Sequence, residues 1–128
     1  MRDYNLLKEK YSHLFEERFW GFDCNDGWYD LLDEMLSKIQ HYQIKIVQIK
    51  EKFAQLRVYT EHIDEEVEKI IEIYEDRSIK TCEICGKRGE IRNTGWIRTL
   101  CNSCYAKKHF PHKMSFRFHV RKMYCICG

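Results

Sequence analysis

The sequence predicts an α+β protein in which a helix-rich N-terminal part, with a short β-hairpin, packs on a C-terminal zinc module. Three observations point to this class. Apolar residues recur at steps of three and four through much of residues 1–80, β-branched residues nearly alternate with polar ones over 43–60, and two Cys-x-x-Cys pairs lie within 81–110. Residues 111–128 form a basic tail with a predicted strand.

The composition bounds the class further. The chain has 128 residues, 44% hydrophobic and 14% aromatic, which is typical of a globular protein with a core of moderate size. No apolar run approaches the ~20 residues of a membrane span, and the N-terminus lacks the regions of a signal peptide. We therefore expect a reducing cytoplasm, where seven cysteines favour metal over disulfides.

The net charge of +2 hides an asymmetry. Residues 1–77 hold 11 Lys and Arg against 18 Asp and Glu, a charge of −7, whereas residues 78–128 hold 11 against 2, a charge of +9. Four thiolates and one Zn²⁺ would remove about two charges from the second figure. This asymmetry bears on the partners of the protein and not on its fold.

Two helices are predicted in the first part of the chain. Over residues 3–19, helical spacing makes one face of Tyr4, Leu7, Tyr11, Leu14 and Phe15. A turn follows, with Asn25 or Asp26 as the N-cap of the next helix. That helix has the clearest apolar stripe in the sequence: Trp28, Leu31, Leu32, Met35, Leu36 and Ile39.

Residues 43–60 fit two patterns. Their near-alternation of β-branched and polar residues indicates two strands joined around residues 52–54. A helical heptad also fits, through Ile46, Ile49, Phe53 and Leu56, and periodicity alone does not decide. We predict the hairpin, because so many β-branched residues lose rotamer freedom in a helix.

Helical spacing returns over residues 61–77, with Thr60 as the expected N-cap. The acidic start of this helix is typical of a solvated face, and an acidic partner-binding surface is the alternative. In the tail, Phe116, Phe118 and Val120 alternate with basic residues, as in a half-buried strand. The predicted core comprises Leu7, Leu14, Trp28, Leu31, Leu32, Met35, Leu36, Ile39, Ile49, Phe53, Leu56, Ile70 and Ile71.

Four cysteines have the spacing of a structural zinc site: Cys82, Cys85, Cys101 and Cys104. Residues 86–100 read as a hairpin between the two pairs, and Tyr105 begins a short helix that stops before Pro111. This order of Cys pair, hairpin, Cys pair and short helix predicts a zinc ribbon or treble clef with one structural Zn²⁺. Two disulfides or a redox Cys-x-x-Cys are disfavoured, since neither a signal peptide nor a βαβ pattern is present.

The remaining cysteines are Cys24, Cys125 and Cys127. The last two, with His109 and His112, suggest a second metal site, but buried or free thiols are the favoured interpretation because Cys-x-Cys is poor zinc spacing. The residues do not indicate an enzyme or a small-molecule substrate. No His-x-Glu precedes a Pro-Cys-x-x-Cys, no histidine lies in 86–100, and no Gly-rich phosphate loop occurs.

The basic second half offers candidate binding residues for nucleic acid or a partner protein, because cations neutralise phosphates and aromatic rings stack on bases. These candidates are Arg88, Arg92, Trp96, Arg98, Lys107, Lys108, Arg117 and Arg121. Alternatively, the aromatic residues form a small core beside the zinc and the arginines face the acidic half, within the monomer or across a dimer. A protein partner or self-association is the first hypothesis, and nucleic-acid binding is the alternative.

Several motifs occur in a fixed order: DGWYDLL at 26–32, EKFAQLRVY at 51–59, CEICG at 82–86 and GWIRTLC at 95–101. This ordered set resembles a family of small uncharacterised proteins encoded by bacteriophages and prophages, over roughly residues 22–106. The resemblance implies an accessory gene of a mobile element that acts in the host bacterial cytoplasm. Such proteins often bind a host protein, including components of defence systems.

Overall fold

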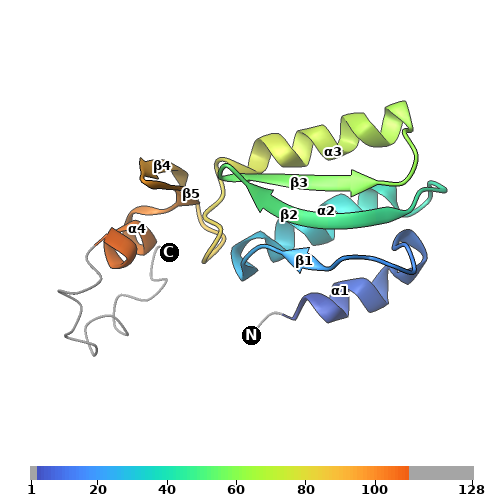
Figure 1. The fold of residues 1–128 in the computed structure, drawn as a ribbon, viewed down its shortest axis with the longest axis horizontal. Helices are drawn as coiled ribbons and strands as arrows, with labels where there is room; N and C mark the ends of the chain where they lie inside the picture. Colours follow the sequence, from blue (N-terminus) through green and yellow to red (C-terminus); the bar gives the residue numbers. More distant parts are fainter. Residues whose placement is uncertain (1–2, 110–128) are drawn as a thin grey trace.

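The computed structural model describes residues 3–109 and confirms a mixed α+β architecture with helices and two small sheets (Figure 1). The predicted tail strand lies outside the described residues. In chain order the elements are α1 (Tyr4–Lys10), η1 (Ser12–Leu14), β1 (Phe22–Asp23), η2 (Asp26–Trp28), α2 (Tyr29–Ile39), β2 (Ile46–Lys52), β3 (Gln55–Thr60), α3 (Glu65–Ser78), β4 (Glu90–Thr94), β5 (Trp96–Leu100) and α4 (Asn102–His109).

The larger sheet has the strand order β1-β2-β3. β2 and β3 are antiparallel, whereas β1 pairs with β2 in parallel, with Phe22 opposite Ile49. In Figure 1, α2 lies behind this sheet and α3 runs along β3, and the two helices contact each other. The smaller sheet, β4-β5, and α4 lie together at the end of the molecule away from the larger sheet (Figure 1).

The turn between β2 and β3 decides for the hairpin and against the helical heptad. Its central residues Phe53 and Ala54 have φ values of +54° and +69°, which is the left-handed geometry of a two-residue type I′ hairpin turn. Phe53 is 66% exposed. Its predicted place in the core is therefore wrong: Phe53 is the exposed residue of the turn, and its neighbour Ala54 is the buried one.

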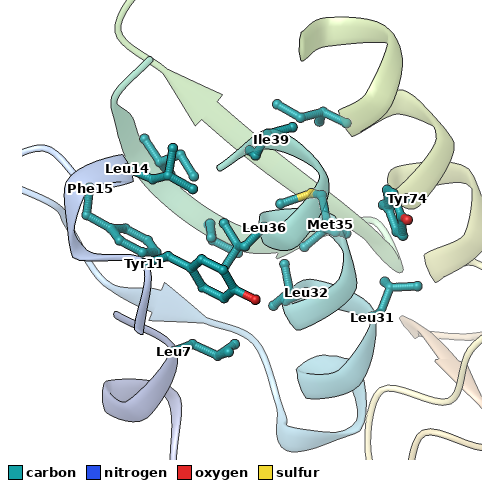
Figure 2. Close-up of a cluster of buried hydrophobic side chains, with 14 of the residues drawn as sticks. Leu7, Tyr11, Leu14, Phe15, Leu31, Leu32, Met35, Leu36, Ile39 and Tyr74 are labelled. Atoms are coloured by element: carbon teal, nitrogen blue, oxygen red, sulfur yellow. The ribbon is translucent and has the colours of Figure 1, made fainter. Parts of the chain in front are cut away.

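The main core joins the apolar stripe of α2 to the hairpin, to α3 and to the first segment of the chain (Figure 2). All six predicted stripe residues are buried, as are Leu7, Leu14, Ile49, Leu56 and Ile71. Ile70 is only partly buried and packs against the cluster from outside. The core extends beyond the predicted set to Tyr11, Phe15, Ile44, Ile46, Val67 and Tyr74.

The first helix is shorter than predicted. α1 ends at Lys10 and Ser12–Leu14 form only a 3₁₀ turn. Phe15 is extended and forms a β-bridge with Ile46, far along the sequence. Helical spacing through Phe15 was therefore misleading, because this side chain reaches the core from an extended backbone.

Helix α3 begins later than predicted, with Asp64 as its N-cap. The Asp64 carboxylate accepts the backbone N–H groups of Glu66 and Val67. Thr60, the expected cap, donates its hydroxyl to the carbonyl of His62 instead. An aspartate accepts amide hydrogen bonds at a helix start and also opposes the positive end of the helix dipole.

Side chains of α3 cap the outer edge of β3. The N–H of Leu56 donates to the Ser78 hydroxyl at 2.9 Å, and the N–H of Val58 donates to the Glu75 carboxylate at 3.1 Å. Without these bonds, the unpaired backbone N–H groups at this edge could pair with a strand of another chain. Burial raises the pKa of Glu75, although the Val58 N–H and nearby Arg57 act in the opposite direction.

Candidate metal centre

The structure brings together the four cysteines that the spacing selected. The sulfur atoms of Cys82, Cys85, Cys101 and Cys104 all lie within 4.8 Å of one another. The Cys85 and Cys101 sulfurs are 3.7 Å apart. Four sulfurs bound tetrahedrally at ~2.3 Å from zinc would be separated by ~3.8 Å. The cluster is therefore close enough to bind a metal ion.

Tight backbone turns position these ligands. In the first pair, the N–H of Gly86 donates to the carbonyl of Cys82 at 2.9 Å, and the N–H of Cys82 donates to the carbonyl of Lys87 at 2.7 Å. Gly86 has a φ of +86°, which an L side chain rarely adopts. The second pair leads directly from β5 into α4, which begins at Asn102 and thus earlier than the predicted Tyr105.

Backbone amides donate to the sulfurs of Cys82 and Cys101. The N–H of Cys104 donates to the Cys101 sulfur at 3.3 Å. Burial by itself would raise the pKa of Cys82, but backbone hydrogen bonds from Cys101, Cys85 and Ile84 outweigh it, so this pKa lies below its ordinary value. The thiolate is the form that binds metal.

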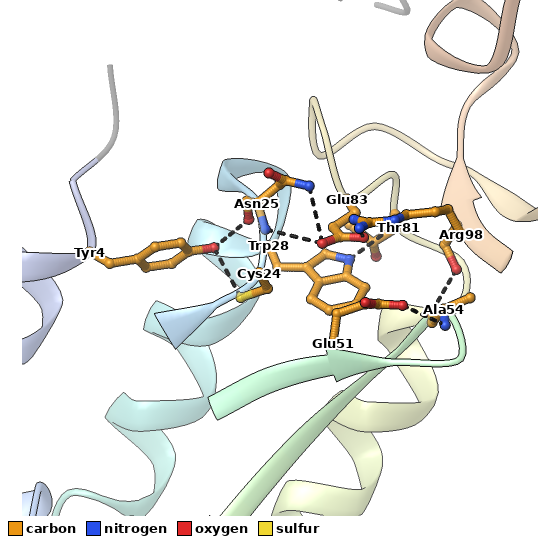
Figure 3. Close-up of polar contacts among 10 residues, drawn as sticks. Tyr4, Cys24, Asn25, Trp28, Glu51, Ala54, Thr81, Glu83 and Arg98 are labelled. Atoms are coloured by element: carbon orange, nitrogen blue, oxygen red, sulfur yellow. Dashed lines mark hydrogen bonds and ion pairs between the residues drawn. The ribbon is translucent and has the colours of Figure 1, made fainter. Parts of the chain in front are cut away.

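Hydrogen bonds dock the metal module, residues 81–109, on the α/β body, and Figure 3 shows those made by Trp28 and Ala54. The N–H of Gly27 donates to the carbonyl of Glu83 at 2.7 Å. The indole N–H of the buried Trp28 donates to the carbonyl of Thr81 at 2.9 Å. On the other side, the Thr99 hydroxyl donates to the carbonyl of Ala54 at 2.7 Å. The hairpin tip and the turn before α2 are thus both tied to the module.

Glu83 is the centre of this docking contact, and no sequence pattern identified it as a candidate residue. Its side chain is 1% exposed and pairs with the Arg98 guanidinium at 2.9 Å. The backbone N–H and the side-chain amide of Asn25 also donate to its carboxylate, at 3.1 and 3.2 Å. Burial raises the pKa of Glu83, and the bonds from Asn25 and Arg98 counter this effect.

The predicted binding arginines have different environments. Arg98 is largely buried against Glu83. Arg92 donates to the Leu100 carbonyl at 3.1 Å and to Asn102 at 2.7 Å, and its guanidinium lies 4.5 Å from the centre of the Tyr105 ring. Arg88 is exposed. Two of these three arginines therefore hold the module together.

The other candidate binding residues are only partly placed. Lys107 is half-buried on α4, which also contains Lys108, and Trp96 begins β5. Arg117 and Arg121 lie outside the described residues. The structure therefore describes the side-chain environment of four of the eight candidates: Arg88, Arg92, Arg98 and Lys107.

Cys24 lies apart from the metal cluster. Its thiol donates to the Tyr4 hydroxyl at 3.7 Å, and burial raises the pKa of this thiol to about 12. A thiol that holds its proton so firmly is a poor metal ligand and a poor nucleophile. Cys125 and Cys127, the other two cysteines considered for a second site, are outside the described residues.

Within residues 3–109, no helix combines the length and the apolar character needed to cross a membrane. Comparisons with family models, with curated proteins and with solved structures found no match to this chain.

Proposed function

We propose that this chain is a non-enzymatic zinc-binding accessory protein that acts by binding another protein. Four cysteine sulfurs at metal-binding separation support zinc as the ion, since soft thiolates in a tetrahedral set select Zn²⁺. The order of Cys pair, β4-β5, Cys pair and α4 supports a zinc ribbon or treble clef. Four protein ligands would leave no open position for water or substrate, so the ion would hold structure.

The observation that carries the binding role is the tip of the β2-β3 hairpin. Phe53 is 66% exposed although its backbone lies in the left-handed region, which costs an L residue roughly 1–2 kcal/mol. Asparagine or glycine would suit this turn better. An exposed aromatic side chain that is kept at the expense of stability is typical of a binding anchor.

Hydrogen bonds hold the backbone of the tip in place behind the exposed Phe53. Ala54 is fully buried, its N–H donates to Glu51 at 2.9 Å, and its carbonyl accepts the Thr99 hydroxyl. A shallow hollow of about 290 Å³, with Phe53, Gly95 and Ile97 in its lining, lies beside the tip. A preordered anchor loses little conformational entropy on binding, which favours affinity for a protein partner.

The resemblance to phage and prophage proteins supports a host or phage protein as the partner, in the host bacterial cytoplasm, and inhibition of a host defence system as the outcome. Self-association through the same tip is the other form of this proposal. Nucleic-acid binding by the basic second half is less well supported, because Arg92 and Arg98 are engaged inside the module.

The test compares the zinc-loaded protein with its Phe53→Asn variant. Asparagine suits the left-handed turn, so the free energy of unfolding should not fall. Proteins that the parent captures from a bacterial lysate, and the variant does not, are then purified and measured for direct binding. Equal capture by both proteins, together with equal self-association in sedimentation velocity, would remove the hairpin tip from the proposal.

A further inference from the structure

One face of the larger sheet is covered by no described helix or strand, since α2 lies behind the sheet in Figure 1. Ile49 and Val58 are cross-strand partners that pack in or against the core. Their neighbours Lys50 and Arg57, which also pair, therefore point to the uncovered side. By the same register, six residues of β2 and β3 lie on this side, and we call them the open sheet face: Gln48, Lys50, Lys52, Gln55, Arg57 and Tyr59.

Three cations gather on this face inside the acidic half of the chain. Lys50, Lys52 and Arg57 form no salt bridge within residues 3–109. Lys50 stands directly opposite Arg57, and like charges in that position are destabilising. The Nε of Arg57 is buried and has no acceptor within the described part of the chain. Within residues 3–109 these three cations therefore have no salt-bridge partner, although Asp23 on β1 stands opposite Lys50.

Half of the acidic residues in this part of the chain lie on two helices. Helices α2 and α3, behind and beside the sheet, carry nine of the 18 Asp and Glu of residues 1–77. Two carboxylates lie beside the face: Asp23, opposite Lys50 on β1, and Glu75, whose pKa is raised by burial and lowered in part by Arg57. Glu75 is already occupied by the Val58 N–H at the sheet edge. Half of the acids thus lie on helices, whereas the three cations lie on the sheet.

We propose that the open sheet face binds single-stranded nucleic acid, with Lys50 and Arg57 on the phosphates and Tyr59 stacked on a base. Tyr59 is 42% exposed and lies two residues from Arg57 on the same strand face. Cations that follow the backbone beside an aromatic ring are the elements of single-strand binding on sheets. Gln48 adds an amide that can hydrogen-bond to base edges, whereas the Gln55 amide already donates to the Glu75 carbonyl at 3.3 Å.

The composition of the face favours this ligand over an acidic protein. A protein interface needs an apolar core, and the six residues offer one aromatic ring among cations and amides. A duplex is read by elements that enter its grooves, whereas unstacked bases can lie on a broad surface. The proposal is independent of the protein-binding role and uses none of the candidate residues of the basic second half.

Fluorescence anisotropy tests the proposal with the zinc-loaded full chain and short labelled oligothymidylate and oligouridylate. Lys50→Gln/Arg57→Gln should weaken binding about tenfold and reduce the slope of log K against log salt by about 1.4, which is ~0.7 per lost phosphate contact. Tyr59→Ala should weaken binding by about tenfold, and Tyr59→Phe should retain it, because the ring still stacks.

Two control variants remove the same charge elsewhere. Lys38→Gln/Lys69→Gln changes exposed lysines of α2 and α3 and should leave binding nearly unchanged, as should Lys87→Gln/Arg88→Gln on the metal module. The proposal fails if neither oligonucleotide binds the parent at low salt, or if only the metal-module variant weakens binding. It also fails if polyglutamate, and no oligonucleotide, shows the sensitivity to Lys50 and Arg57.

Discussion

Glu83 and Arg98 form an ion pair that is almost completely removed from water. The guanidinium lies 2.9 Å from the carboxylate, and the two side chains are 1% and 18% exposed, respectively. Glu83 stands between the two cysteines of the first pair, and Arg98 lies in β5. Asn25 of the α/β body donates to the second carboxylate oxygen. One buried charge thus holds both halves of the metal module and the body in contact.

Replacement of Arg98 by methionine should leave the buried Glu83 carboxylate without a charged partner. Loss of one partner of a buried ion pair costs about 3–5 kcal/mol, because the remaining charge stays desolvated. We expect a decrease of this size in the free energy of unfolding of Arg98→Met, measured by urea denaturation of the zinc-loaded protein. The matched control is Arg88→Met on the same module, which is exposed and should change stability by less than about 0.5 kcal/mol.

A double variant separates the ion pair from general damage. Glu83→Gln/Arg98→Met carries no buried charge at this position, so it should recover part of the stability that Arg98→Met loses. If Arg98→Met were as stable as the parent, Arg98 would not have the structural role described above. Its assignment as a surface binding residue would then regain support.

Gly27 is required for a different reason, a close approach of two backbones. A Cβ at this position would lie 2.2 Å from the carbonyl oxygen of Cys82 and 2.4 Å from the carbonyl carbon of Glu83. Gly27→Ala should therefore force the turn before α2 away from the first Cys pair. We expect this to lower the free energy of unfolding by about 1–3 kcal/mol. Urea denaturation checks this value.

The control for Gly27 is a glycine with open space around it. Gly95 has a φ of +89°, and a Cβ added there would meet no heavy atom within 4 Å. Asparagine tolerates that backbone region. Gly95→Asn should therefore change stability by less than Gly27→Ala. The close backbone approach would be unimportant if the two variants lost equal stability.

Local signals made the metal ligands, the stripe of α2 and the β2-β3 hairpin predictable. Each depends on residues close together in sequence: Cys pairs, helical spacing, or alternation around a turn. The alternative heptad failed because Phe53 occupies a turn position. The shorter first helix could not be predicted, since Phe15 is extended by its bridge to Ile46, a contact across 31 positions.

The docking contact around Glu83 could not be predicted either, because it also joins residues that are far apart in the sequence. Glu83 in a Cys-x-x-Cys pair resembles a solvated loop residue, and only the fold brings Asn25 and Arg98 to it. Arg92 and Arg98 likewise counted as surface charge, because residue type alone does not show whether an arginine has an internal acceptor. Gly27 gave a turn signal but no sign of the backbone it approaches.

Removal of the metal should destabilise the body as well as the module, because Gly27, Trp28 and Ala54 bond to the module. X-ray absorption should show four sulfur ligands at about 2.3 Å. Chelation, or Cys101→Ser, should lower the free energy of unfolding and abolish stoichiometric zinc binding. Cys24→Ser is the matched control, since Cys24 lies outside the cluster and should leave the zinc content unchanged.

The Glu34 carboxylate offers a test of pH dependence. It accepts hydrogen bonds from the Arg77 guanidinium at 2.9 Å and from the Tyr74 hydroxyl at 2.8 Å, and these lower the pKa of Glu34 below its ordinary value. The lowered pKa stabilises the folded state above the pKa of the unfolded chain. That contribution is lost as pH falls through the folded pKa.

Glu34→Gln should therefore lower the free energy of unfolding at neutral pH, and the difference from the parent should vanish at acidic pH. Because the Glu34 side chain is 47% exposed, solvent screening limits the effect to about 0.5 kcal/mol. Urea denaturation over a pH series provides the measurement. Glu72→Gln, an exposed α3 residue without a salt bridge in residues 3–109, should show no such pH-dependent difference. A difference for Glu34→Gln that persisted at acidic pH would instead indicate lost packing, because the charge would no longer be present.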